Sequence, residues 1–484
     1  MLFNSYQFLL LFLPTVLLLV GLIRWLNRPQ YLVPLLSIAS FGFYAYWDPR
    51  YVALLAGSIV FNYLIGIILT GMMDHRPRRT LLAAGVVGNL VLLGYFKYVG
   101  FFVGSANALF GTELDVIRLA LPLGISFFTF TQIEYLVDAY RRKAPVYPVA
   151  EYVLFVTFFP HLIAGPILRH HEVIPQFESD LRGALPDTAL ASGFLFLAIG
   201  IFKKVVIADS LAVWVNTAFA GWTLSLIDSW MGALAYTFQL YFDFSGYSDM
   251  AVGIALMLNI TIPYNFNSPY KSATIGDFWR RWHMSLSTFL REYLYFPLGG
   301  SRRGRARTLL NLIITMLLGG LWHGAGWTFV LWGGWHGVLL AVDHAWRWTG
   351  RELKPMVTRP LTFVAVVVGW VVFRSPSIAT AHAYLDAMAG RNGVVLPASL
   401  SGALSPLAAY GVRFGPLIGV PEGGFGHRLA LLAMLVAFVS LLPNTQELAA
   451  RMRPQARWAV FAAALFITAF LLTGQVTEFL YYQF

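Results

Sequence analysis

The longest stretch of this chain without a formal charge covers residues 308–342, and further uncharged stretches cover residues 1–23 and 51–73. A helix that crosses the hydrocarbon of a bilayer needs about 20 mostly apolar residues, so each stretch is long enough. Only 12% of the residues are charged and 58% are hydrophobic, whereas an ordinary soluble domain is about 25% charged. The composition excludes a cytosolic enzyme and a disordered chain, and it predicts an integral membrane protein.

The fold predicted from these stretches is an all-α, polytopic transmembrane helical bundle. With short connections, the length allows about 10 to 13 spans, together with re-entrant or interfacial helices. A membrane barrel is not expected, because the apolar stretches lack the alternation of lipid-facing and lumen-facing residues. We predict one integral membrane domain over residues 1–484, with an extramembrane or surface stretch over residues 375–428, where Gly and Pro recur.

The net charge of +11 comes from 34 Lys and Arg against 23 Asp and Glu. The basic residues gather in short clusters between apolar stretches, which is how the positive-inside rule marks a polytopic protein, so no nucleic-acid partner is expected. The first apolar stretch reads as a retained span rather than a signal peptide. Arg24 and Arg28 follow it, which predicts a periplasmic N-terminus. Cysteine is absent, which excludes disulfides and thiol catalysis.

Residues 267–300 differ from their surroundings and predict an amphipathic helix that is interfacial or re-entrant. Thr274 and Asp277 fit the start of a capping box. An apolar stripe follows at helical spacing, and it comprises Phe278, Trp282, Leu286, Phe289 and Tyr293. His283 falls at the border between the apolar and polar faces. The helix either anchors the chain at the membrane surface or roofs a cavity, and the pattern alone leaves both alternatives open.

His323 is the most unusual ionisable residue of the sequence. It follows Arg307 by enough residues to lie deep in the apolar region if the segment is helical. An ionisable side chain at that depth predicts a functional site. It lies within GGLWHGAGW at residues 319–327, where glycines allow a ligand or another backbone to approach closely. A neutral imidazole there can accept a proton from a hydroxyl group that attacks a thioester. The alternative is a histidine packed into a glycine-rich helix crossing.

The remaining polar residues are less specific. Gln239, Tyr241, Asp243, Ser245, Tyr247, Ser248 and Asp249 cluster in the middle of the sequence, where they either form an acceptor pocket or bind backbone amides at a broken helix. Packed, hydrogen-bonded roles are expected for His161 and His336. We predict that Glu134, Asp138, Lys203 and Lys204 lie near span ends and reach water by snorkelling. No metal site is predicted, because no segment has metal-ligand spacing.

Seven segments together resemble the membrane-bound O-acyltransferase (MBOAT) family, and within it the alginate O-acetyltransferase (AlgI) type. They are LPLGISFFTF at 121–130, FFPHLIAGP at 158–166, YFDFSGYSD at 241–249, PYNFNSP at 263–269, DFWRRWHMS at 277–285, GLWHG at 320–324 and LLPNTQ at 441–446. The resemblance covers essentially the whole chain.

The resemblance implies a helical bundle around a central tunnel, with His323 as the catalytic histidine and His283 as the second catalytic position. It implies a bacterial inner-membrane enzyme that takes an acetyl group from a cytoplasmic donor, expected to be acetyl-CoA or an acyl carrier. No bound cofactor is expected. The expected partners are a periplasmic SGNH-type acetyltransferase, the polysaccharide export machinery and the bilayer. The residues expected to contact substrate are Asp243, Ser245, Tyr247, Asn267, Trp322 and Arg280.

The residues leave the final acceptor open. The acceptor implied by the resemblance is a secreted polysaccharide such as alginate. Peptidoglycan, cellulose, teichoic acid that receives D-alanine, and a lipid are alternatives within the same enzyme class. A transporter or channel without catalysis is the alternative outside it, although the inverted repeats typical of transporters are not visible in the sequence. The Arg-rich residues 301–307 either attract the phosphates of the donor or only set the orientation.

Overall fold

The computed structural model describes residues 1–117, 119–421, 423–453, 455–473 and 480. Its chain forms two compact units. Unit 1 comprises residues 1–202, 246–265 and 449–476, and unit 2 comprises residues 203–245, 266–448 and 477–484. The long helix α11, Leu226–Met257, contributes its first part to unit 2 and its last part to unit 1, and α20, Thr445–Arg451, is also shared.

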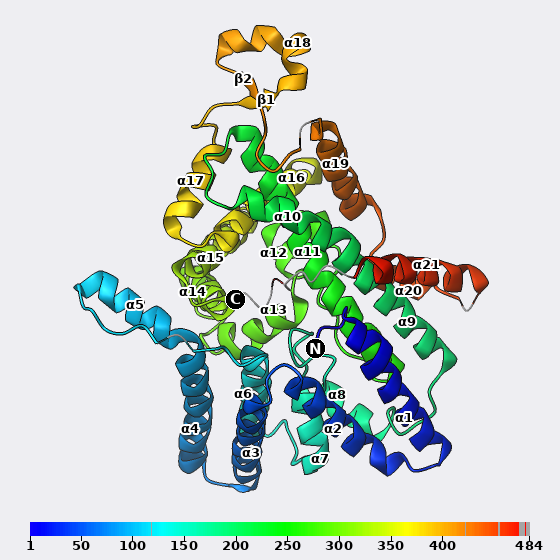
Figure 1. The fold of residues 1–484 in the computed structure, drawn as a ribbon. Helices are drawn as coiled ribbons and strands as arrows, with labels where there is room; N and C mark the ends of the chain where they lie inside the picture. Colours follow the sequence, from blue (N-terminus) through cyan, green and yellow to red (C-terminus); the bar gives the residue numbers. More distant parts are fainter. Residues whose placement is uncertain (118, 422, 454, 474–479, 481–484) are drawn as a thin grey trace. The chain divides into compact units, whose positions relative to one another are not determined.

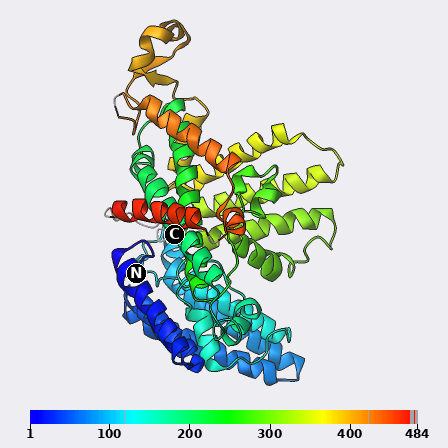
Figure 2. The ribbon, with the colours of Figure 1, turned by 90° about the vertical axis from the view of Figure 1, so that its right-hand side faces the viewer.

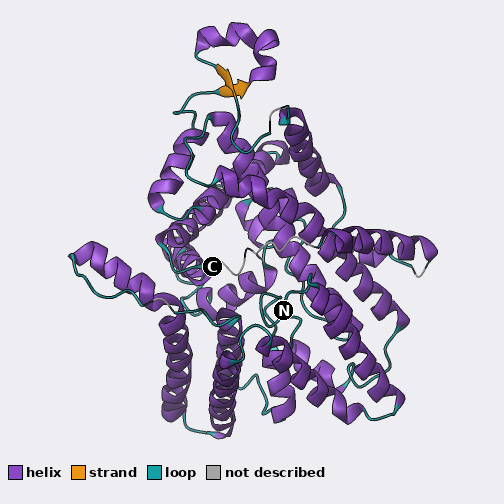
Figure 3. Cartoon of the chain, viewed as in Figure 1, coloured by secondary structure: helices purple, strands orange, loops and turns teal. Residues whose placement is uncertain are grey.

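Unit 1 is helical in the part of the chain that is described (Figures 1 and 3). Its α-helices, besides its parts of α11 and α20, are α1 Leu13–Trp25, α2 Leu32–Ala45, α3 Arg50–Gly71, α4 His75–Leu93, α5 Val99–Phe110, α6 Ile125–Tyr140, α7 Val149–Thr157, α8 His170–Glu178, α9 Asp187–Phe202 and α21 Ala456–Leu472.

Unit 2 holds three of the seven segments that resemble the MBOAT family and shares two more with unit 1. Its α-helices, besides its parts of α11 and α20, are α10 Asp209–Ala218, α12 Ile275–Trp279, α13 Met284–Leu290, α14 Arg305–His323, α15 Trp327–Arg347, α16 Pro355–Arg374, α17 Ile378–Met388, α18 Ser401–Leu404 and α19 Phe425–Leu441. A short parallel pair of strands, β1 Val395–Pro397 and β2 Arg413–Gly415, lies within the predicted surface stretch 375–428 (Figure 3).

The predicted fold class, a polytopic helical membrane protein, is confirmed. Five helical segments among the described residues are long and apolar enough to cross a bilayer, or six if the bent pair α19 and α20 is one span. The five are Gln7–Trp25, Arg50–Gly71, Arg76–Phe110, Asp187–Ala218 and Pro355–Arg374. Other helices, such as α11 and α15, are long enough but more polar, so the expected 10 to 13 spans stay a prediction.

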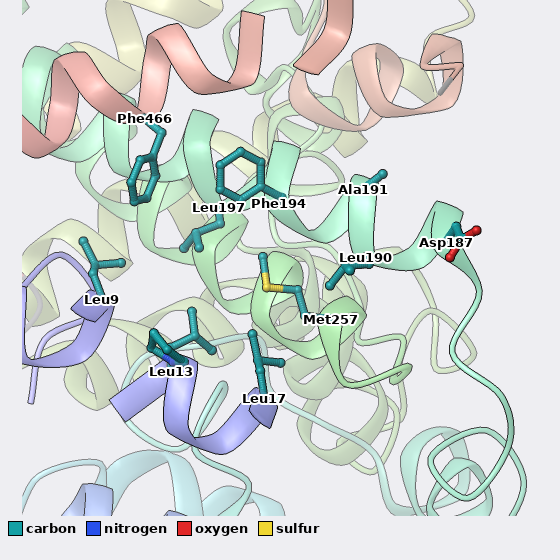
Figure 4. Close-up of a pocket in the computed structure, with 11 residues that line it drawn as sticks. Leu9, Leu13, Leu17, Asp187, Leu190, Ala191, Phe194, Leu197, Met257 and Phe466 are labelled. Atoms are coloured by element: carbon teal, nitrogen blue, oxygen red, sulfur yellow. The ribbon is translucent and has the colours of Figure 1, made fainter. Parts of the chain in front are cut away.

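In unit 1, α9 crosses the last part of α11 at two pairs of glycines. A Cβ atom on Gly193 would lie 2.7 Å from the carbonyl oxygen of Gly253, and one on Gly200 would lie 2.6 Å from that of Gly246. Backbones this close require glycine on both helices. Beside this crossing lies a groove of about 540 Å³. Figure 4 shows its lining, which comes from α1 and the turn before it, α9, α11 and α21. Its lining is apolar apart from Asp187 at the start of α9, so it offers no imidazole for acid–base chemistry.

The prediction of one amphipathic helix over residues 267–300 is wrong. The segment folds as two short helices, α12 and α13, followed by a π-helical turn at Arg291–Tyr295. The helix is interrupted at His283, whose φ of +44° lies in the left-handed region. The predicted capping box is confirmed in part, because the Thr274 hydroxyl accepts a hydrogen bond of 3.1 Å from the Asp277 amide at the start of α12.

The snorkelling predicted for four ionisable residues is also wrong. Lys203 and Lys204 lie within the long helical segment Asp187–Ala218 and are 8% and 3% exposed. Glu134 and Asp138 lie on α6 and are 1% and 5% exposed. Buried charges need partners. The structure supplies local partners, Asp209 for Lys204 and Arg141 for Asp138. It also supplies partners from segments distant in sequence, which the local pattern could not show.

Candidate active site

A backbone contact between α14 and α15 holds the candidate site in unit 2. The two helices lie side by side and antiparallel (Figures 1 and 2, yellow-green). A Cβ atom on Gly320 would lie 2.2 Å from the Phe329 carbonyl oxygen, and one on Gly333 would lie 2.2 Å from that of Met316. No side chain fits at either position. The glycines that the sequence places around His323 therefore let a second backbone approach, one of the two roles expected for them.

His323 is the last residue of α14 and is 6% exposed. Its imidazole packs among aromatic rings, with ring centroids 5.0 Å from Trp322, 5.1 Å from Trp332 and 5.6 Å from Phe373. Trp332 comes from α15 and Phe373 from α16. Three aromatic rings from α14, α15 and α16 therefore form walls around this imidazole.

His283 lies beside His323. Their ring centroids are 6.1 Å apart, and His283 also packs edge-on against Phe244 of α11 with centroids 4.8 Å apart. His283 is fully buried, and burial lowers its pKa to about 3. A left-handed backbone at a non-glycine residue costs on the order of 1 kcal/mol. The chain adopts this conformation at the break between α12 and α13, where the imidazole faces the second histidine.

Three of the sequence segments that carry the family resemblance meet around this break. The Asn267 amide donates to the Arg281 carbonyl at 2.9 Å, and the Phe266 ring lies 5.0 Å from Trp282. The LLPNTQ segment binds the same loop, because Gln446 donates to the Phe266 carbonyl at 2.6 Å and Asn444 donates to the Asn267 side-chain oxygen at 2.9 Å. The role of these segments in the structure is to hold the backbone that carries His283.

Of the residues expected to contact substrate, Trp322 lies closest to the histidines. Its ring centroid is 5.0 Å from His323 and 6.1 Å from His283. Asp243 and Ser245 flank Phe244 on α11, so this part of α11 reaches the site. Asp243 forms an ion pair with Lys204, with 2.8 Å between Oδ1 and Nζ, and Lys204 also pairs with Asp209.

The other three predicted contacts have interactions of their own. Asn267 uses its side-chain oxygen to bind Asn444. Arg280 is largely exposed and lies 3.6 Å from the Asp277 carboxylate. Tyr247 belongs to unit 1, where its ring stacks on Phe3 with centroids 4.8 Å apart. Substrate binding by all six residues stays a prediction.

His336 has the packed, hydrogen-bonded role that was expected for it. It lies on α15, one turn after Trp332, and is fully buried. Its ring centroid is 5.0 Å from that of Trp332, and the indole nitrogen of Trp279 donates to its Nδ1 at 3.3 Å. Trp332 therefore packs between two histidines that the sequence separates. The turn-spaced WGGWH pattern was visible, but only the fold brings Trp279 to it.

Within the described residues, one group has the arrangement of possible metal ligands, namely Glu134, Asp138, His170 and His171 in unit 1. His170 Nε2 lies 3.4 Å from Asp138 and 3.9 Å from Glu134, and its Nδ1 lies 2.8 Å from the Tyr147 hydroxyl. His170 therefore has two carboxylates and a hydroxyl as polar neighbours. The prediction that the protein binds no metal stays a prediction.

Comparison with known proteins decides the family. The model of the membrane-bound O-acyltransferase family, MBOAT, matches residues 82–375. The chain belongs to this family. The match includes both α12–α13, with His283, and α14–α15, with His323, so the buried histidine pair lies within the family's own segment. The protein is an O-acyltransferase and a multi-pass membrane protein.

The similar proteins are named for acyl transfer to polymers of the cell envelope. The chain is 42% identical to a peptidoglycan O-acetyltransferase of Helicobacter pylori, over 82% of this chain and 81% of the relative. It is 46% identical to a probable alginate O-acetylase AlgI of Pseudomonas aeruginosa, over 80% and 75%. A teichoic acid D-alanyltransferase of Streptococcus thermophilus is 27% identical, over 52% and 68%. The resemblance to the AlgI type is confirmed.

Proposed function

We propose that this protein takes an acetyl group from acetyl-CoA on the cytoplasmic side of the inner membrane and passes it outward for O-acetylation of a secreted polysaccharide. The observation that carries the proposal is the pair His283 and His323, whose rings lie 6.1 Å apart in an apolar, aromatic environment. A buried base can act only on reacting groups that reach it. A donor and an acceptor that enter from opposite sides of the membrane would both reach it.

In the proposed reaction, His323 is the general base. A hydroxyl oxygen attacks the thioester carbonyl carbon and His323 accepts the hydroxyl proton. The new C–O bond forms, the C–S bond breaks, and the departing thiolate takes the proton back from His323. His283 orients the His323 ring or shares its proton. A relay in which His323 itself carries the acetyl group is the second route with the same balance of atoms.

The relatives favour acetyl over D-alanyl as the transferred group. Two relatives named for O-acetyl transfer are 42% and 46% identical over about four fifths of the chain. The relative named for D-alanyl transfer is 27% identical over about half of it. The two acetylating relatives act on different polymers by name, so the proposal is limited to O-acetylation of an envelope polysaccharide, with alginate and peptidoglycan as the first polymers to examine. A periplasmic acetyltransferase of SGNH type and the export machinery are the proposed partners, and the N-terminus is proposed to be periplasmic.

The test is His323→Ala in cells that make the polymer. We expect the acetyl content of the exported polymer to disappear while the amount of protein in the membrane is unchanged. His171→Ala is the matched control, because His171 is half-exposed on α8. Polymer that remains normally acetylated in His323→Ala cells refutes the assignment. Capture of labelled acetyl on wild-type protein after rapid denaturation at neutral pH, absent from His323→Ala, distinguishes the relay from direct transfer.

A further inference from the structure

A second groove, of about 360 Å³, lies in unit 2, and no step of the proposed reaction uses it. Three elements line it, namely the 3₁₀ turn Pro269–Lys271, the first half of α16 and the end of α19. Its volume falls at the lower end of the range of about 300–1,000 Å³ that is typical of ligand pockets. The groove can therefore hold a head group, but it is small for a whole lipid.

Two basic side chains line this groove, Lys271 and Arg359, and its lining includes no Asp or Glu. Lys271 Nζ donates a hydrogen bond of 2.7 Å to the Leu442 carbonyl after the end of α19, which uses one of its three N–H groups. Among the residues that the structure describes, the Arg359 side chain has neither a carboxylate partner nor a hydrogen bond. Two cations that share a hollow without a carboxylate favour an anionic ligand.

The remainder of the groove is largely apolar and lies between two helices that face lipid. Phe363 of α16 and Val436 of α19 line it. Both helices belong to segments that are apolar enough to cross a bilayer, α19 as part of the bent pair. On these helices Leu361 is 60% exposed and Val436 is 41% exposed, so hydrocarbon chains are their natural surroundings. A ligand of this groove therefore meets cations and acyl chains together.

The charges around the start of α16 indicate which leaflet supplies the ligand. Residues 347–359 hold four Lys and Arg and one Glu. The positive-inside rule places such a segment on the cytoplasmic side. The cytoplasmic surface of a membrane is negative, and basic pockets between membrane helices on that side bind the head groups of anionic lipids.

We propose that this groove binds an anionic phospholipid of the cytoplasmic leaflet, with Lys271 and Arg359 on its phosphate and Phe363 against the start of an acyl chain. The phosphates of acetyl-CoA offer the same charge without a hydrocarbon tail, so the apolar lining favours the lipid. The inference goes beyond the proposed function and rests on the groove alone.

A bound phosphate would join two parts of unit 2 that surround the histidine pair. Lys271 belongs to the turn that follows Asn267, and the ring of Tyr270 in that turn lies 6.2 Å from Trp282 and 5.5 Å from Phe363. Contacts of one phosphate with both cations link this turn to α16. Because a ligand that binds only the folded state stabilises it, the lipid should raise the melting temperature.

The test measures lipid binding by purified full-length protein in a zwitterionic detergent, by native mass spectrometry and by the melting temperature during titration. Phosphatidylglycerol is the probe, and phosphatidylcholine with the same acyl chains is the control lipid. Wild type should bind phosphatidylglycerol about tenfold more tightly than phosphatidylcholine. Arg359→Gln should weaken phosphatidylglycerol binding about fivefold, whereas Arg359→Lys keeps the charge and should bind nearly as wild type does. Lys271→Gln should weaken binding in the same way as Arg359→Gln.

Arg351→Gln is the matched control, because it removes the same charge from the same basic segment and Arg351 does not line the groove. It should bind phosphatidylglycerol as wild type does. Equal losses in Arg351→Gln and Arg359→Gln, or equal binding of the two lipids by wild type, overturn the proposal. Displacement of phosphatidylglycerol by an equal concentration of acetyl-CoA or inorganic phosphate also overturns it, because the groove would then recognise a phosphate without a lipid.

Discussion

Two regions of this molecule bury histidines, and they hold them by different means. In unit 1, His170 lies between the carboxylates of Glu134 and Asp138 and beside the Tyr147 hydroxyl. In unit 2, aromatic rings pack around the imidazoles of His283 and His323. The first histidine thus lies beside carboxylates and a hydroxyl, and the other two lie among aromatic rings.

The two regions also differ in what positions their histidines. His170 has polar neighbours on α6 and at Tyr147. In unit 2, the glycine contact of α14 with α15 and the left-handed turn at His283 set the positions of His323 and His283. Burial alone did not distinguish the two kinds, since all of these residues are at most 6% exposed.

The largest expected effect comes from breaking the backbone contact of unit 2. Gly333→Ala would place a Cβ atom 2.2 Å from the Met316 carbonyl oxygen, so α14 and α15 must separate. We expect acetyl transfer to be lost and the yield of folded protein in detergent to fall, as judged by gel filtration. Gly334→Ala is the control on the same helix. Wild-type activity and yield in Gly333→Ala would contradict the proposed helix contact.

The corresponding change in unit 1 should affect stability and not catalysis. His170→Leu leaves Glu134 and Asp138 buried without their histidine, although Arg141 still lies 3.8 Å from Asp138. Leaving buried polar groups without one of their partners costs on the order of 1–3 kcal/mol, so the melting temperature should drop while kcat per folded molecule stays that of wild type. A fall in kcat at an unchanged melting temperature would show that His170 takes part in catalysis.

A smaller effect is expected from pH. Burial lowers the pKa of folded His283 to about 3, while the pKa in the unfolded chain is about 6.5. Below pH 6.5 the unfolded chain takes up a proton that the folded chain does not, so stability falls with a slope of about 1.4 kcal/mol per pH unit. Between pH 7.5 and 5.5 the melting temperature of wild type should fall more steeply than that of His283→Gln. Parallel profiles would show that His283 is not held neutral.

The smallest expected effect is that of a chelator. If ion pairs hold the His170 group together, EDTA leaves the melting temperature unchanged and metal analysis of purified protein finds no stoichiometric ion. A lower melting temperature with EDTA that Zn²⁺ restores would show that Glu134, Asp138, His170 and His171 form a metal site, against the prediction from the sequence.

The parts of the account that could be predicted are those encoded locally. Uncharged stretches identify apolar helices, Thr274 marks the start of α12, and His323 is conspicuous because so few ionisable residues occupy its stretch. The glycines around it indicate a close approach, although they do not say whether a ligand or a backbone makes it. The structure shows a backbone, that of α15.

The parts that could not be predicted depend on contacts between distant segments. From the sequence, Lys204 was expected to lie at the end of a span. In the structure, Asp243 of α11 lies 2.8 Å from it. The spacing of the apolar stripe predicted one helix that continues through His283, because a single left-handed residue leaves that spacing unchanged. Trp279 and His336 are 57 residues apart, and nothing in either local pattern indicates that they pair.

The central claim is that His323, and not merely any buried histidine, drives acyl transfer. The direct measurement is the initial rate of labelled acetyl transfer from acetyl-CoA in proteoliposomes, per folded molecule, for wild type, His323→Ala and His170→Leu. Loss of a general base should lower the rate about 10³-fold in His323→Ala, whereas His170→Leu should match wild type. A His323→Ala rate within tenfold of wild type would contradict the claim.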